Sequence, residues 1–83
     1  MSEVKTIREL KQIIVDNGMT IEPANLKGRY KITSKDGLIW KTVRFQNAKS
    51  CSYATVNVLH YDFEGREEWF PFYIDGFIEE MTL

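Results

Sequence analysis

Few side chains in this sequence could support catalysis or bind a metal ion. His60 is the only histidine and Cys51 the only cysteine, and two such residues are too few for a structural zinc site. Cys51 has no base beside it in the sequence, so we expect a small packed residue rather than a reactive thiol. We expect His60 to be a structural residue near Glu68 at the sheet margin, with a general base or a pH switch as the alternative. The sequence therefore predicts no enzymatic activity and no cofactor.

An acidic cluster follows His60 and could in principle hold a hard cation, which prefers oxygen ligands. It comprises Asp62, Glu64, Glu67 and Glu68, but it lacks the alternating Asp/Asn spacing and bidentate Glu of a calcium loop. We expect a solvated hairpin tip instead and no metal site. The glycines are isolated from one another, so no phosphate-binding loop is expected.

Aromatic and basic side chains offer a better case for binding. The run Trp69-Phe70-Pro71-Phe72-Tyr73 places four rings around one proline. Because side chains of an extended chain alternate between faces, Phe70 and Phe72 share one face and Trp69 and Tyr73 share the other. Tyr, Trp and Arg are enriched at interface hot spots. We therefore predict a binding surface made of Trp69, Tyr73, Tyr61, Tyr53, Trp40, Arg29, Lys31 and Arg44. Coverage of these rings by another part of the chain, or self-association, is the alternative.

Charge is distributed unevenly along the chain. The net charge is -1, yet residues 27–49 carry seven cations and one anion, and residues 50–83 carry one cation and seven anions. Two solvated faces of opposite sign would explain this segregation. A basic patch that meets an anionic partner, or an acidic patch that meets a cationic one, is the functional alternative.

Length and composition predict one globular domain over residues 1–83. An 83-residue chain has room for one core, and 43% hydrophobic with 28% charged residues is the ordinary globular range. A single cysteine gives no sign of an oxidising compartment. The first residues lack a secretory apolar run, and no apolar stretch is long enough to span a bilayer. We expect a cytoplasmic protein that does not bind membranes.

The tract Thr6-Ile7-Arg8-Glu9 fits a capping box and predicts the start of an amphipathic helix that ends at Asn17-Gly18. The tract from Thr6 to Lys11, followed by Gly18, resembles the first helix of SAP-type and related helix-extension-helix modules, which bind nucleic acids. The likeness covers the first 18 residues. Beyond it the chain has Pro23, Gly28 and a strand-like alternation, so that fold and function are not carried over. We expect residues 19–26 to form a connector.

Two antiparallel hairpins are expected next. Asp36-Gly37 suits a two-residue turn that places Tyr30 opposite Val43 and Ile32 opposite Lys41. A three-residue loop ending in Gly65 pairs Asp62 with Arg66. This second register gathers an apolar face, on which the helix would lie, from Ala54, Val56, Val58, Phe70, Phe72 and Ile74.

Pro71 cannot donate to a neighbouring strand, so we place its strand at the sheet edge or at a bulge. Residues 75–83 should form a short helix capped by Asp75, or else a short strand. The predicted fold is α+β, with an N-terminal amphipathic helix packed on one face of a roughly four-stranded antiparallel sheet and a short C-terminal element. Strand order, and whether the basic and aromatic patches merge, stay open.

The function that we expect is that of a small protein-binding regulator or inhibitor, acting through the aromatic outer face or an edge strand. Short chains of this style are common among phage and mobile-element accessory proteins. A homo-oligomer is possible, and binding of RNA or single-stranded DNA through the basic and aromatic face is the alternative. Against nucleic acid stands the acidic C-terminal third, which would repel a polyanion unless it lies elsewhere.

Overall fold

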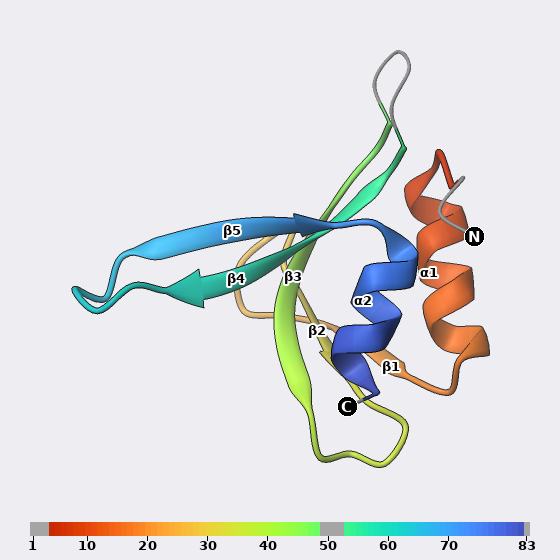
Figure 1. Cartoon of the computed structure of the whole chain (residues 1–83), viewed down its shortest axis with the longest axis horizontal. Helices are drawn as coiled ribbons and strands as arrows, with labels where there is room; N and C mark the ends of the chain where they lie inside the picture. The colour runs from red at the N-terminus through yellow and green to blue at the C-terminus, as the bar shows by residue number, and fades with distance from the viewer. Residues whose placement is uncertain (1–3, 49–52, 83) are drawn as a thin grey trace.

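The computed structural model describes residues 4–48 and 53–82 as two helices and five strands (Figure 1). In chain order they are α1 (Ile7–Asp16), β1 (Thr20–Pro23), β2 (Tyr30–Thr33), β3 (Trp40–Gln46), β4 (Thr55–Tyr61), β5 (Glu67–Phe72) and α2 (Ile74–Met81). Every neighbouring pair of strands is antiparallel, and the spatial order β1-β2-β3-β4-β5 follows the sequence. The expected α+β fold is confirmed in this broad form.

Helix α1 begins where the capping box predicts. Thr6 is its N-cap, the Thr6 Oγ1 accepts the Glu9 N–H at 3.2 Å, and the Thr6 hydroxyl donates to the Glu9 carboxylate at 2.8 Å. Leu10 and Ile14 on one side of α1 are fully buried. The chain then enters a strand rather than a second helix, so the likeness to SAP-type modules ends with α1.

The expected four-stranded sheet was wrong by one strand. Residues Thr20–Pro23, predicted as part of a connector, form β1 and pair with β2 from Thr20↔Thr33 to Pro23↔Tyr30. This strand is four residues long and mostly exposed, so its sequence has no clear apolar alternation to predict it.

The register of the first hairpin is as predicted, with Tyr30 opposite Val43 and Ile32 opposite Lys41. Its turn differs, because the Gly37 N–H donates to the Ser34 carbonyl at 3.0 Å and centres the turn on Lys35 and Asp36. The next cross-strand bond joins Ser34 to Ile39, so the loop holds four residues. The predicted loop of residues 36–37 and the observed loop of residues 35–38 have the same midpoint. Both therefore give the same strand register, which is why the predicted pairing was correct.

The second hairpin has the predicted three-residue loop. Asp62 N–H donates to the Arg66 carbonyl at 3.0 Å, and Gly65 takes a φ of 82°. The strands pair from Tyr61↔Glu67 to Val56↔Phe72, so His60 faces Glu68 as expected. Gly65 supplies the left-handed conformation that this turn requires and that other residues adopt only at a cost.

Both helices lie side by side against one face of the sheet (Figure 1). The buried core joins α1 and α2 to Ile32, Val43, Val56 and Val58 of the strands and to Ala54, which directly precedes β4. From α2 it takes Ile74, Phe77 and Met81. The C-terminal segment is therefore the predicted short helix, but Tyr73 rather than Asp75 is its N-cap, and Asp75 lies in the first turn.

The helices do not cover the whole inner face. The distal part of the β4–β5 hairpin projects away from them (Figure 1), and Phe70, predicted as core, is 44% exposed. Phe72, two residue pairs nearer to α2, is half-buried against the core. Alternation assigned Phe70 to the correct face but could not show how far the helices extend.

Pro71 lies on an edge strand, as predicted, because β5 ends the sheet. Hydrogen-bonded and non-bonded pairs alternate in an antiparallel ladder. Since Asp62 and Arg66 are bonded, the pair Asn57↔Pro71 is non-bonded, and position 71 turns its main chain outward. On the opposite edge, Ala24 bonds Arg29, so Pro23 in β1 also faces outward. Each free edge thus carries a proline at an outward position.

Candidate binding face

The sheet face opposite the helices, called the outer face below, gathers every predicted binding residue. Lys31, Trp40 and Arg44 alternate with the core residues of β2 and β3, as Tyr61 and Trp69 do in β4 and β5. Arg44 lies opposite Asn57, and Asn57 lies opposite Pro71. The basic residues of the first hairpin and the rings of the second are therefore on one continuous surface, and the question that the sequence left open is answered.

Trp69, on the edge strand β5, has its ring within cation–π distance of two guanidinium groups of the outer face. The Arg44 Cζ is 4.4 Å from the Trp69 ring and the Arg29 Cζ is 5.1 Å from it. Cation–π contacts of this kind hold a ring in place. Trp69 is half-buried as a result, so this ring is less accessible than its alternation with Phe70 suggested.

Arg29 also joins the first hairpin to β5 through Glu67. Its two terminal nitrogens donate to the two Glu67 carboxylate oxygens at 3.0 and 2.7 Å. This hydrogen bonding lowers the pKa of Glu67 and raises the pKa of Arg29. Bidentate pairing fixes orientation as well as charge. One of the acidic residues expected to repel an anionic partner is therefore neutralised on this face.

Trp40 and Tyr61 are the most exposed rings of the outer face. Their exposed fractions are 59% and 63%, and Tyr73 follows at 48%. The Lys31 Nζ lies 5.1 Å from the Trp40 ring centroid. Tyr53 packs edge-on against Tyr73 with ring centroids 5.9 Å apart, so these two tyrosines form a separate pair next to the hollow lined by Thr55, Pro71 and Tyr73.

A cleft separates Trp40 from Tyr61. Pairing between β3 and β4 runs from Gln46↔Thr55 only as far as Val43↔Val58, and the two hairpins diverge beyond this point (Figure 1). The divergence leaves a pocket of about 340 Å³ lined by Trp40, Lys41, Thr42, Leu59, His60 and Tyr61. A neighbouring hollow shares Thr42, Leu59 and Tyr61 with it and extends to Leu26 and Arg29.

Sequence reasoning missed Thr42 and Leu59, which line this cleft, and Leu26, which lines the neighbouring hollow. Their types are ordinary for a strand or a loop, and the cleft exists only because β3 and β4 separate. No local pattern encodes the point at which two strands stop pairing. The exposed Trp40 and Tyr61 were the only signal, and they were included for their residue type alone.

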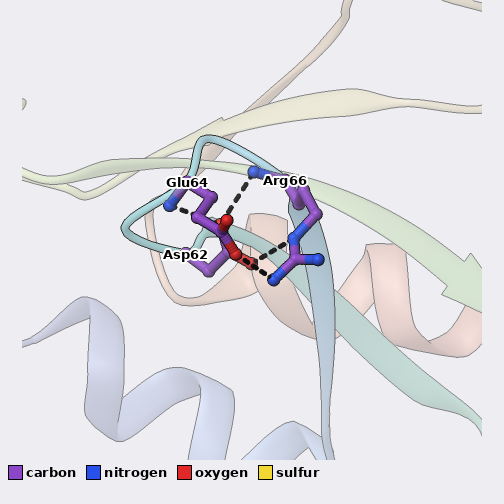
Figure 2. A network of polar contacts seen from close by, with 3 residues as sticks. All are labelled: Asp62, Glu64 and Arg66. Atoms are coloured by element: carbon purple, nitrogen blue, oxygen red, sulfur yellow. Dashed lines mark hydrogen bonds and ion pairs between the residues drawn. The ribbon is translucent and has the colours of Figure 1, made fainter.

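The acidic hairpin tip is organised around Asp62 (Figure 2). The Asp62 Oδ1 accepts the N–H groups of Glu64 and Arg66 at 2.8 and 2.9 Å, and its Oδ2 accepts the Arg66 Nε–H at 2.9 Å. The Arg66 Nη2 also donates to Glu64. The main-chain bond from Arg66 is the largest cause of the lowered pKa of Asp62. These carboxylates are thus used within the turn, and Phe63 at its end is 98% exposed.

Of the two residues considered for catalysis, the structure describes His60. His60 packs its ring 4.7 Å from the ring of Phe70, and Cys51 lies outside the described residues. No three His, Cys, Asp or Glu side chains within residues 4–48 and 53–82 gather as metal ligands would. In the same ranges no helix is long and apolar enough to cross a membrane.

Comparisons with protein-family models, with curated proteins and with solved structures gave no match to this chain. The outer face and its cleft are therefore interpreted from their own geometry.

Proposed function

We propose that this chain is a non-enzymatic, cytoplasmic regulator or inhibitor that docks on a larger protein through its outer face. The observation that supports this function best is the exposure of Trp40 and Tyr61 on the two sides of one cleft. Large rings that can also donate a hydrogen bond are the usual anchors of protein interfaces. The phage or mobile-element origin stays a prediction from the style of the sequence.

The sheet edges are poorer docking sites than the outer face. A partner strand that joined β1 or β5 would need outward N–H donors, and the outward positions 23 and 71 are prolines without such a donor. The described edge strands are also short, with four residues in β1 and six in β5. We therefore assign docking to the outer face and not to an edge.

The experiment compares capture of host proteins by the wild type and by the double variant Trp40→Ala/Tyr61→Ala, with and without nuclease. Both rings are more than half exposed, so we expect the variant to fold and to lose its partner at least tenfold in apparent affinity. Phe63→Ala is the matched control, because Phe63 is also an exposed ring but lies at the hairpin tip. Unchanged capture by the double variant, with its fold verified by circular dichroism, would disprove docking at these rings.

Binding of RNA or single-stranded DNA is the second candidate. The observation that favours it is that the basic residues and the rings form one continuous surface on the outer face. Arg44 and Lys31 lie beside Trp69 and Trp40, an arrangement in which rings stack on bases and cations meet phosphates. The test is titration with an oligothymidylate at low salt, where such contacts are strongest. Tight binding that weakens steeply with salt would establish this candidate, and an absence of binding at low salt would eliminate it.

A further inference from the structure

The cleft between β3 and β4 presents main chain as well as side chains. Ser34 and Ile39 are a hydrogen-bonded pair of the β2–β3 ladder, so by alternation the N–H and C=O of Trp40 point away from β2. Asp62 and Arg66 are likewise a hydrogen-bonded pair of the β4–β5 ladder. By the same alternation, the N–H and C=O of the preceding residue, Tyr61, point away from β5. Both sets of groups are directed into the cleft, and neither Trp40 nor Tyr61 has a paired residue across it.

This arrangement makes the cleft the place where the sheet can accept another strand. The two outer edges carry prolines at outward positions, whereas Trp40 and Tyr61 keep their N–H donors. The stretch of β3 that has no partner in β4, Trp40–Thr42, is three residues long. This corresponds to about 10 Å of extended chain at about 3.3 Å per residue. An incoming segment of three or four residues would therefore satisfy main-chain groups that folding leaves open.

The charge around the cleft selects the chemistry of that segment. Lys41 and His60 are among its lining residues, and none of its lining residues is a carboxylate. Lys31 stands over the neighbouring Trp40 ring. Within the described residues Lys41 has no ion pair. Lys31 lies on the opposite face of the sheet from Lys41, where its cross-strand neighbour is Glu22. Of the acids on β5, Glu67 is paired with Arg29, and Glu68 is the cross-strand neighbour of His60.

We propose that the cleft binds an extended acidic segment of the partner protein, whose main chain pairs with Trp40 or Tyr61 and whose carboxylates face Lys41. The inference rests on the proposed function, because it names the part of the partner that the outer face recognises. Beyond that function, the inference states that the bound segment pairs its main chain with the sheet and that the segment is acidic. Neither property follows from the exposed rings alone.

The test uses nuclear magnetic resonance of the ¹⁵N-labelled full chain with four probes. The first is a capped heptapeptide that alternates glutamate and valine, and the second replaces each glutamate by lysine. The third is the glutamate peptide with every main-chain nitrogen methylated, which removes the N–H donors from both of its edges. The fourth is an oligothymidylate of ten nucleotides.

We expect the glutamate peptide alone to shift the amides of Trp40, Thr42, Leu59 and Tyr61 and to slow hydrogen exchange at Trp40 or Tyr61. Lys41→Glu should weaken its binding roughly threefold, as expected for loss of an exposed ion pair. Lys35→Glu is the matched control, because Lys35 lies in the β2–β3 turn outside the cleft.

Three results would overturn the inference. These are equal binding of the methylated peptide, equal binding of the lysine peptide, and shifts of the same amides by the oligothymidylate without shifts by the glutamate peptide. Failure here leaves the proposed function standing if Trp40→Ala/Tyr61→Ala still abolishes capture of a protein. If that double variant captures normally, the proposed function fails whatever the peptides do.

Discussion

The two hairpins of this sheet are built alike but differ in what covers them. Each has an aspartate that accepts hydrogen bonds within its turn, Asp36 in β2–β3 and Asp62 in β4–β5. The first hairpin places Ile32 and Val43 at full burial, and the second does the same for Val56 and Val58. Phe70, further along the second hairpin, is 44% exposed. Both carry an apolar residue toward the helix face, so the sequence pattern is equivalent. The difference shows that alternation determines on which face of the sheet a side chain lies. How far the helices extend over that face determines which of its side chains are buried.

The largest expected effect contrasts two apolar residues of that same face. Ile32→Ala should cost about 2–5 kcal/mol of unfolding free energy, because a fully buried side chain leaves a cavity under the helices. Phe70→Ala should cost about 1 kcal/mol or less, because much of the ring already meets water. Urea denaturation of both variants measures the difference. Equal losses of unfolding free energy would mean that Phe70 is packed as tightly as Ile32.

A smaller effect concerns how the two turns make the stability of the fold depend on pH. Hydrogen bonds hold the pKa of Asp62 below its ordinary value of 3.8, and the Ser34 hydroxyl is the main cause of the same shift in Asp36. A carboxylate with a lowered folded-state pKa stabilises the fold above its unfolded pKa, and this stabilisation is lost as the pH falls through the folded value. The wild type should therefore lose stability below about pH 4.

Asp62→Asn should remove more of this acid sensitivity than Asp36→Asn. Asp62 accepts two main-chain N–H groups and an arginine, whereas Asp36 accepts one main-chain N–H and a hydroxyl. Urea midpoints measured between pH 2 and pH 6 give the slopes for each variant. A wild-type slope retained in Asp62→Asn would show that the Asp62 network contributes nothing to folding.

The smallest expected effect concerns the contact that joins the hairpins across the outer face. Glu67→Gln should loosen Arg29 and change the fluorescence of Trp69, which Arg29 partly covers, with only a slight shift of the urea midpoint. Glu68→Gln is the control, since Glu68 faces the other side of the sheet opposite His60. An identical fluorescence change in both variants would contradict a specific role of the Arg29–Glu67 pair.

Much of the fold could be predicted because its signals are local. The capping tract at Thr6, the register centred on Asp36-Gly37 and the loop ending in Gly65 each depend on a few neighbouring residues. The short strand β1 was missed because a four-residue, mostly exposed edge has no clear periodicity. Asp75 was assigned the cap because of its residue type, although helix α2 begins one residue before it.

The candidate site was predictable in its residue types but not in its shape. The sequence identified Trp40, Tyr61, Trp69 and the nearby cations from side-chain chemistry. It could not show that two arginines cover Trp69, since Arg29 and Trp69 are forty residues apart and meet only through the order of the strands. The cleft was equally hidden, because pairing between β3 and β4 ends without a proline, a glycine or a charge run to mark the point.

The outward prolines at both sheet edges bear on how the protein behaves when it is crowded. An exposed edge strand is a template on which a second molecule can add its own strand, and repeated addition leads to fibrillar aggregates. Pro23 and Pro71 remove a donor from each edge without breaking a bond inside the sheet, because both occupy positions that do not pair inward. The sheet is thus protected against growth in both directions, and this protection leaves every internal cross-strand hydrogen bond in place.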